Sequence, residues 1–231
     1  MQKTFKALSA LLSYPDEELQ DAAPELLSVI DAEDLLPADR RPLVDALIEE
    51  IATGDLYDLQ ERYVELFDRT RSLSLHLFEH VHGESRDRGQ AMIDLKSLYE
   101  QNGLVLGAAE LPDYLPAFLE FLSTRPLMEA RRMLSQTAHI LTALTERLRK
   151  RRSPYAAVFD SLAALSALAP DVPGVEVVPE GEDADPNDLA ALDAQWEEEA
   201  VTFGPDAAPS CKDRIVAQIR AGRRPPADLP R

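Results

Sequence analysis

Three histidines lie within one short stretch of the chain, at His76, His80 and His82. A helix would place His76 and His80 on one face, since residues four apart are neighbours on a helix surface, and His82 or Glu84 could supply a third metal ligand. Glu79 directly precedes His80, so the order differs from the H-E-x-x-H pattern of zinc peptidases. We therefore favour a partly buried, hydrogen-bonding role for these imidazoles. A metal-dependent helical hydrolase using Glu79 or Glu84 is the alternative.

Charged residues flank this region on both sides: Arg69, Arg71, Arg86 and Arg88. Arginine binds carboxylates through two parallel hydrogen bonds. These side chains could hold an acidic segment of another protein, or pin the loop to acids of the same chain such as Asp68 or Glu79, which is the interpretation we favour. Glu110, Pro112 and Asp113 have the same ambiguity, because an aspartate also favours the first turn of a helix.

The remaining candidate chemistry is sparse. The single cysteine, Cys211, excludes an internal disulfide and a cysteine cage for zinc or an iron-sulfur cluster, and no histidine lies near it to act as a base. The nine glycines form no Walker A or G-x-G-x-x-G run. The sequence therefore favours recognition over turnover, and we expect neither an enzyme nor a bound cofactor or metal.

Helical periodicity accounts for the chain up to about residue 168 and predicts an all-α domain. Stripes of apolar residues three or four apart occur at residues 5–12, 19–27, 43–51, 56–67, 92–99, 127–152 and 159–168. The longest, 127–152, ends in a cluster of cations that complements the helix macrodipole or, alternatively, docks acids. We expect Pro24 to break or kink its helix, Gly103 to end one in the left-handed conformation, and Pro112 to begin another.

The composition changes after Pro170. Residues 171–231 contain fourteen acidic residues against six lysines and arginines, together with many prolines. This predicts a helical domain over 1–170 and an acidic, largely disordered tail over 171–231, in which only 186–203 has helical spacing. The net charge of −18 argues against nucleic-acid binding. With no signal peptide and no span of about 20 apolar residues, we expect a soluble, cytoplasmic protein without stable membrane insertion.

Two segments carry a resemblance to a known family. The run from Tyr63 to Gly103 resembles the signature of the NarJ family, chaperones that assemble respiratory nitrate reductase. Residues 110–114, E-L-P-D-Y, are similar to the E-x-P-D-H motif of the wider TorD-like group of molybdoenzyme chaperones. Tyr114 stands in the place of that histidine, so no role of the imidazole carries over. A looser likeness covers residues 4–168 and, in the acidic tail, 191–203.

The resemblance implies a single helical domain of the TorD-like chaperone type. It also implies an assembly chaperone that binds the apo form of the catalytic (alpha) subunit of nitrate reductase, including its N-terminal segment, and keeps it competent for molybdenum cofactor insertion before membrane docking. A general helical scaffold protein remains a further alternative. We expect a monomer, with a dimer as the alternative. The client-binding residues expected from the segments of strongest resemblance are Phe67, Arg69, Arg71, Leu73, Leu75, His76, Phe78, Glu110, Pro112, Asp113 and Tyr114, with the face of 127–152 as the alternative site.

Overall fold

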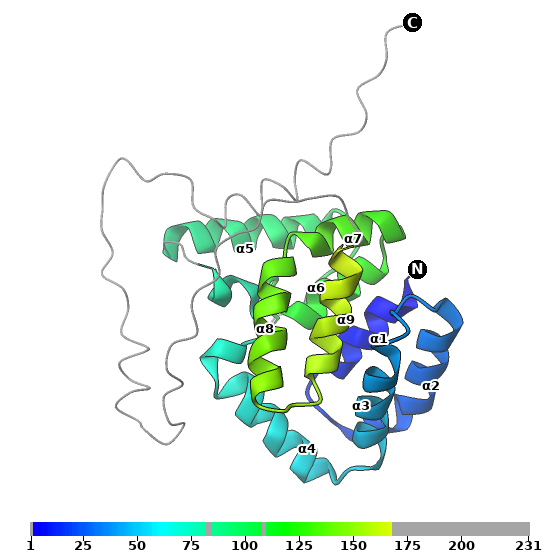
Figure 1. Ribbon diagram of the computed structural model, residues 1–231. Coiled ribbons are helices and arrows are strands. Elements are labelled where there is room, and N and C mark those ends of the chain that lie inside the picture. Colours follow the sequence, from blue (N-terminus) through cyan, green and yellow to red (C-terminus); the bar gives the residue numbers. More distant parts are fainter. Residues whose placement is uncertain (1, 82–84, 108–109, 168–231) are drawn as a thin grey trace, which may run out of the picture.

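The computed structural model describes residues 2–81, 85–107 and 110–167 (Figure 1). Within these ranges the regular elements are helices, and one isolated antiparallel bridge joins His76 to Tyr114. The α-helices are α1 (Lys3–Leu11), α2 (Glu17–Glu33), α3 (Arg41–Thr53), α4 (Leu56–Tyr63), α5 (Ser85–Glu100), α6 (Leu115–Ser123), α7 (Leu127–Ser135), α8 (Ala138–Lys150) and α9 (Ala156–Ala167). A π-helical turn, η1 (Val64–Asp68), continues α4, and two 3₁₀ turns follow, η2 (Arg71–Leu73) and η3 (Leu77–His80). The predicted all-α class is confirmed.

Local sequence signals set several helix ends. The side chain of Asp16 accepts a hydrogen bond from the backbone N–H of Leu19 at the start of α2, and Asp55 caps α4 in the same way. These carboxylates satisfy N–H groups that have no partner within a first helical turn. Gly103 follows α5 with φ of 84°, the left-handed conformation that glycine adopts without steric cost.

The helices pack against one another around one core. Helix α1 contacts α2 and α6, α2 contacts α3, and α9 contacts α3, α7 and α8. Figure 1 shows α8 and α9 side by side, joined by a short connection at one end. The first and last helices of the described domain therefore belong to one body.

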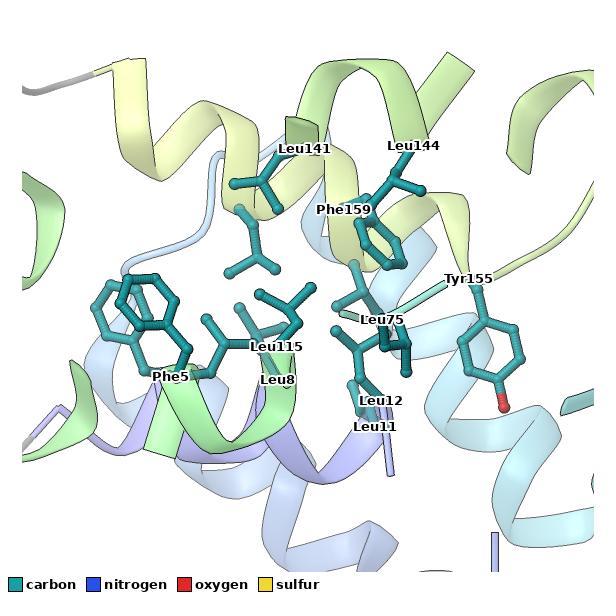
Figure 2. Packing of buried hydrophobic residues seen from close by; sticks show 14 of the residues in the cluster. Phe5, Leu8, Leu11, Leu12, Leu75, Leu115, Leu141, Leu144, Tyr155 and Phe159 are labelled. Carbon is teal, nitrogen blue, oxygen red and sulfur yellow. The ribbon is translucent and has the colours of Figure 1, made fainter. Parts of the chain in front are cut away.

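The core also takes in residues that are not in α-helices. Figure 2 shows Leu8 and Leu12 of α1 on one side, Leu141 and Phe159 of α8 and α9 on the other, and Leu75 between them. Leu75 is 3% exposed, although its backbone lies in the connection between η2 and η3. Replacing a buried leucine with alanine costs about 2–5 kcal/mol. Because the side chain of Leu75 is anchored in the core, the polar residues next to Leu75 in the sequence are held in position.

The predicted long helix over 127–152 is wrong, because it divides into α7 and α8. The break falls at Gln136 and Thr137. The Gln136 amide donates to the carbonyl oxygen of Arg132, and the Thr137 hydroxyl donates to that of Leu134. Side chains that bond the nearby backbone compete with the helical pattern. The apolar period runs through the break, so periodicity alone gave no sign of it.

Two expectations about proline need correction. The expected break at Pro24 is wrong, because helix α2 runs through this residue without ending, whereas a kink there stays a prediction. The buried face of α2, which includes Leu19 and Ile30, keeps the helix packed on both sides of the proline. Pro112 precedes its helix instead of starting it. Helix α6 begins at Leu115, and Pro116 is the proline in its first turn, where a missing N–H costs nothing.

We predict that His139 makes folding stability fall at acid pH. Its Nε2 atom is buried and has no hydrogen-bond partner among the described residues, and burial lowers its pKa to about 4. The unfolded pKa is about 6.5, so this stability is complete above about pH 6.5 and is lost as pH falls towards the folded pKa. The loss at pH 5 is at most about 2 kcal/mol. Urea denaturation at pH 7 and pH 5 should show a smaller difference for His139→Leu than for the unchanged protein, and an equal difference would contradict the prediction.

The division into a domain over 1–170 and a tail over 171–231 stays a prediction, because residues 168–231 lie outside the described residues. Deleting 171–231 should leave the cooperative thermal transition nearly unchanged. Unfolding enthalpy scales with the number of ordered residues. A loss of more than about a third of that enthalpy in calorimetry would show that the tail belongs to the domain.

Candidate functional site

The two segments that carry the predicted site residues lie against each other. The backbone N–H of Leu77 donates to the carbonyl of Asp113 at 3.0 Å, and the N–H of Leu115 donates to the carbonyl of Leu75 at 2.8 Å. These bonds flank the bridge between His76 and Tyr114. The structure thus brings together residues 75–78 and 113–115, and we call this contact the bridge junction.

Asp113 holds the bridge junction together from inside. Its side chain is fully buried. One carboxylate oxygen accepts from the backbone N–H of Phe78 at 3.1 Å, and the other lies 3.2 Å from Nδ1 of His76. The alternative that Asp113 merely favours the start of a helix is therefore wrong. Its acceptor oxygens serve a segment 35 residues earlier in the chain.

His76 and His80 act as hydrogen-bonding groups, as favoured from the sequence, but they do not share a helix face. His76 is extended before η3, and its hydrogen bond to Asp113 raises its pKa. His80 is buried and its Nε2 donates to the carbonyl of Ser74 at 2.7 Å, while burial lowers its pKa. His82 and Glu84 lie outside the described residues.

We predict that the histidines are not needed to hold a metal. In the described part of the chain, no group of three or more His, Cys, Asp or Glu side chains could bind an ion. Replacing His76, His80 and His82 with glutamine should leave metal content at background in elemental analysis. Equimolar zinc or iron in the unchanged protein, lost in the triple variant, would overturn this expectation.

Aromatic side chains continue from the bridge junction towards the surface. The hydroxyl of Tyr63 donates to the carbonyl of Leu12 at 2.9 Å and lies 3.1 Å from that of Tyr114. The single hydroxyl proton of Tyr63 is donated to the carbonyl of Leu12. The hydroxyl of Tyr114 is therefore the donor in its contact with the hydroxyl of Tyr63. The rings of Tyr114 and His76 are 5.4 Å apart, and Tyr14 meets Tyr63 edge-on at 5.6 Å. We call Tyr14, Tyr63, Tyr114 and His76 the aromatic row.

Tyr14 is a residue that the sequence did not single out. It is 49% exposed, although its ring packs on buried Tyr63. Tyr114 and His76 are partly exposed. The sequence signal that could have found Tyr14 is an aromatic residue placed directly before Pro15, just beyond a fully apolar helix face.

The other predicted site residues divide by burial. Four apolar side chains lie in the core and are at most 5% exposed: Phe67, Leu73, Leu75 and Phe78. Pro112 is buried as well, and Tyr99 donates its hydroxyl proton to the Pro112 carbonyl at 2.8 Å. Arg69, Arg71 and Glu110 are exposed. The buried residues of the predicted site therefore form the packed layer beneath its exposed residues.

Intramolecular pairing holds for part of the charged set. Arg88 lies 3.5 Å from Glu79, as the favoured interpretation required. Glu110 accepts from the backbone N–H of Gly107 at 2.9 Å. Arg147, from the cationic end of the stripe over 127–152, is buried and donates to the carbonyl of Ser72 at 2.8 Å. It therefore fixes η2 against α8.

Comparison with known proteins identifies the family of the helical domain that contains the bridge junction. The family model described as nitrate reductase delta subunit matches residues 15–161, which include every predicted site residue. The chain belongs to the nitrate reductase delta subunit family. The suspected family relationship is thereby confirmed.

Relatives of this delta subunit family member cover most of its length. It is 46% identical over 211 residues to the nitrate reductase molybdenum cofactor assembly chaperone NarJ of Escherichia coli K12, covering 90% of this chain and 87% of that protein. It is 41% identical over 218 residues to the probable chaperone NarW of the same strain, covering 94% and 90%. The probable NarJ of Bacillus subtilis 168 is 35% identical over 166 residues, covering 71% and 88%. These delta subunit relatives are named as chaperones, and none of these comparisons supports the hydrolase alternative.

Among the described residues, no helix is long and apolar enough to cross a bilayer.

Proposed function

We propose that this protein is a dedicated assembly chaperone for respiratory nitrate reductase. It binds the apo form of the catalytic subunit and keeps it competent for molybdenum cofactor insertion before the subunit docks on its membrane partner. The observation that carries this proposal is the 46% identity over 90% of the chain to an Escherichia coli chaperone named for that task. Because the subunit must be met before it docks, the proposed location is the cytoplasm, and the proposed state is a monomer.

The client site is proposed on the surface above the bridge junction. Its contact residues are the exposed and half-buried members of the predicted set: Arg69, Arg71, His76, Glu110 and Tyr114. Phe67, Leu73, Leu75, Phe78, Pro112 and Asp113 support them from the core. In support of this division, the carboxylate of Asp113 ties His76 to the segment that carries Tyr114.

The proposed ligand is an amphipathic helix in the N-terminal segment of the catalytic subunit. Such helices are recognised through apolar anchors at i, i+3, i+4 and i+7. Tyr14 and Tyr114 of the aromatic row offer ring surface for those anchors, and aromatic residues dominate many binding energies. Leu111, which is 47% exposed beside Pro112, adds aliphatic surface.

The charged members have a different task. Arg69 and Arg71 at the edge of an interface would govern encounter and orientation more than residence time. Their contribution should therefore weaken with added salt, whereas the contribution of the rings should not.

The experiment that tests the function measures molybdenum in the client. Nitrate reductase catalytic subunit is purified from nitrate-respiring cells with and without the gene for this chain, and molybdenum is measured per subunit. We expect the metal to be lost without the gene and restored by its return. Unchanged molybdenum content in both strains would contradict the proposed function. A pull-down that recovers other proteins but no nitrate reductase would favour the general scaffold.

A further inference from the structure

The aromatic row exposes apolar surface in the described part of the chain. Tyr14, at one end of the row, is 49% exposed. Leu111, which is 47% exposed, lies beside Tyr114, whose backbone N–H donates to the Leu111 carbonyl at 3.1 Å. Single exposed apolar residues are common on protein surfaces. Two that flank the same hydrogen-bonded pair, Tyr63 and Tyr114, mark a surface on which an apolar partner can dock.

One segment of the acidic tail has the sequence of such a partner. Within residues 186–203, four apolar residues recur at i, i+3, i+7 and i+14, a spacing that places them on one side of a helix: Leu189, Leu192, Trp196 and Phe203. Amphipathic helices bind apolar surfaces through anchors with this kind of spacing. An isolated helix of this length is marginally stable in water, and helices gain most of their stability by packing their apolar side. The segment therefore requires an apolar surface in order to be helical.

The length of chain between α9 and this segment suits the distance to the aromatic row. Helix α9 has 12 residues, or a length of about 18 Å. Tyr155 directly precedes α9, and its ring lies 6.4 Å from that of Tyr63. Tyr63, in the middle of the row, is therefore about 30 Å from the far end of α9.

Residues 168–185 supply the connection to the segment. A flexible chain of that length has an r.m.s. end-to-end distance of about 24 Å and reaches about 60 Å when extended. The effective concentration of a tethered partner is highest when the r.m.s. length of the linker matches the span, and lies in the mM range for short linkers. The segment can therefore reach the row, and at a high local concentration.

We propose that residues 186–203 dock as a helix on the aromatic row of the same chain, in the place of the client helix. The proposal rests on the proposed function in one respect, because it takes the aromatic row as the client site. The contact is apolar. Its effect is to cover the exposed rings until a helix of higher affinity displaces the tail, so that weakly binding apolar segments of other proteins are kept out.

Fluorescence of the full-length chain tests the docking. Trp196 is the only tryptophan of the chain, so its emission reports the segment directly. We expect emission that is blue-shifted from that of a free 186–203 peptide and less quenched by acrylamide, because the indole is covered by the row. Both effects should persist at about 1 M salt, where the Debye length is about 3 Å.

Variants in the tail make the fluorescence result specific without touching the helical domain. Leu189→Ser with Leu192→Ser should return the emission of the full-length chain to that of the free peptide. The matched pair Ala191→Ser with Ala194→Ser, on the opposite side of the helix, should leave it blue-shifted. Emission of the unchanged chain equal to that of the peptide would overturn the proposal, as would equal effects of the two pairs.

Paramagnetic broadening locates the contact. A nitroxide is attached to Ala194→Cys in a Cys211→Ser background, and amide peaks of the full-length ¹⁵N-labelled chain are measured. We expect intensity loss centred on residues 12–17, 75–78 and 111–115. Loss centred on another face contradicts docking on the row. The same loss in a mixture of nitroxide-labelled ¹⁴N chain with unlabelled ¹⁵N chain contradicts docking within one chain, because a second copy would then supply the segment.

Client titration separates this proposal from the proposed function. The N-terminal segment of the catalytic subunit should bind the full-length Leu189→Ser and Leu192→Ser variant about threefold more tightly than the Ala191→Ser and Ala194→Ser control, if the tail occupies the row for about two-thirds of the time. Equal affinities would overturn the competition between tail and client. Binding by neither variant would contradict the proposed function, and the fluorescence and broadening would still decide whether the tail docks.

Discussion

Replacing Asp113 with alanine is expected to lower the free energy of unfolding by about 3 kcal/mol or more. The carboxylate is fully buried and bonds the Phe78 N–H and the His76 ring. Hydrogen bonds to a charged group are worth about 1.5–3 kcal/mol each, and a buried donor left without its acceptor adds its own desolvation cost. Urea denaturation of the alanine variant measures the loss.

Two further variants make the Asp113 result specific. Asp113→Asn keeps one acceptor oxygen and should be destabilised less than the alanine variant. Glu110→Ala removes an exposed carboxylate from the same motif, and exposed substitutions usually stay within about 0.5 kcal/mol. Equal stability of Asp113→Ala and Glu110→Ala would mean that Asp113 does not hold the bridge junction.

Removing two rings of the aromatic row should weaken client binding by about 2 kcal/mol, or roughly thirtyfold in Kd. The variant is Tyr14→Ala with Tyr114→Ala, and affinity is measured by calorimetry with the N-terminal segment of the catalytic subunit. The expected loss comes from apolar contact and should persist at high salt. Folding stability is measured alongside, because each ring also packs on or bonds to Tyr63.

Two controls separate binding from folding in this experiment. Tyr57→Ala removes an 81% exposed tyrosine on α4 that has no part in the row, and should leave affinity unchanged. Tyr114→Phe keeps the ring and removes the hydroxyl that donates to Tyr63, so it should cost stability more than affinity. Unchanged affinity in a folded Tyr14 and Tyr114 double variant would move the client site elsewhere, first to the α7 and α8 face.

Much of the fold could be predicted because its determinants are local. Apolar spacing gives the helices, Asp16 and Asp55 give two starts, and Gly103 gives one stop. The division between α7 and α8 could not be predicted, because the side-chain bonds of Gln136 and Thr137 interrupt the helix without interrupting its apolar period.

The site could be predicted only as two stretches of sequence. Family resemblance identified both, and the structure joins them. The arrangement of His76 could not be predicted, because its extended backbone depends on Asp113, 37 residues further along the chain. Burial of Leu75 in a connection likewise depends on α1, α8 and α9, which no local pattern near residue 75 reveals.

The central claim is that this chain recognises the N-terminal segment of the nitrate reductase catalytic subunit. Calorimetric titration of that segment into the full-length chain tests it most directly, with a scrambled peptide of the same composition as control. We predict saturable one-to-one binding with a negative heat-capacity change, the mark of apolar burial, and no binding of the scrambled peptide, whose helical apolar face is lost. Equal binding of both peptides, or of neither, would contradict the claim.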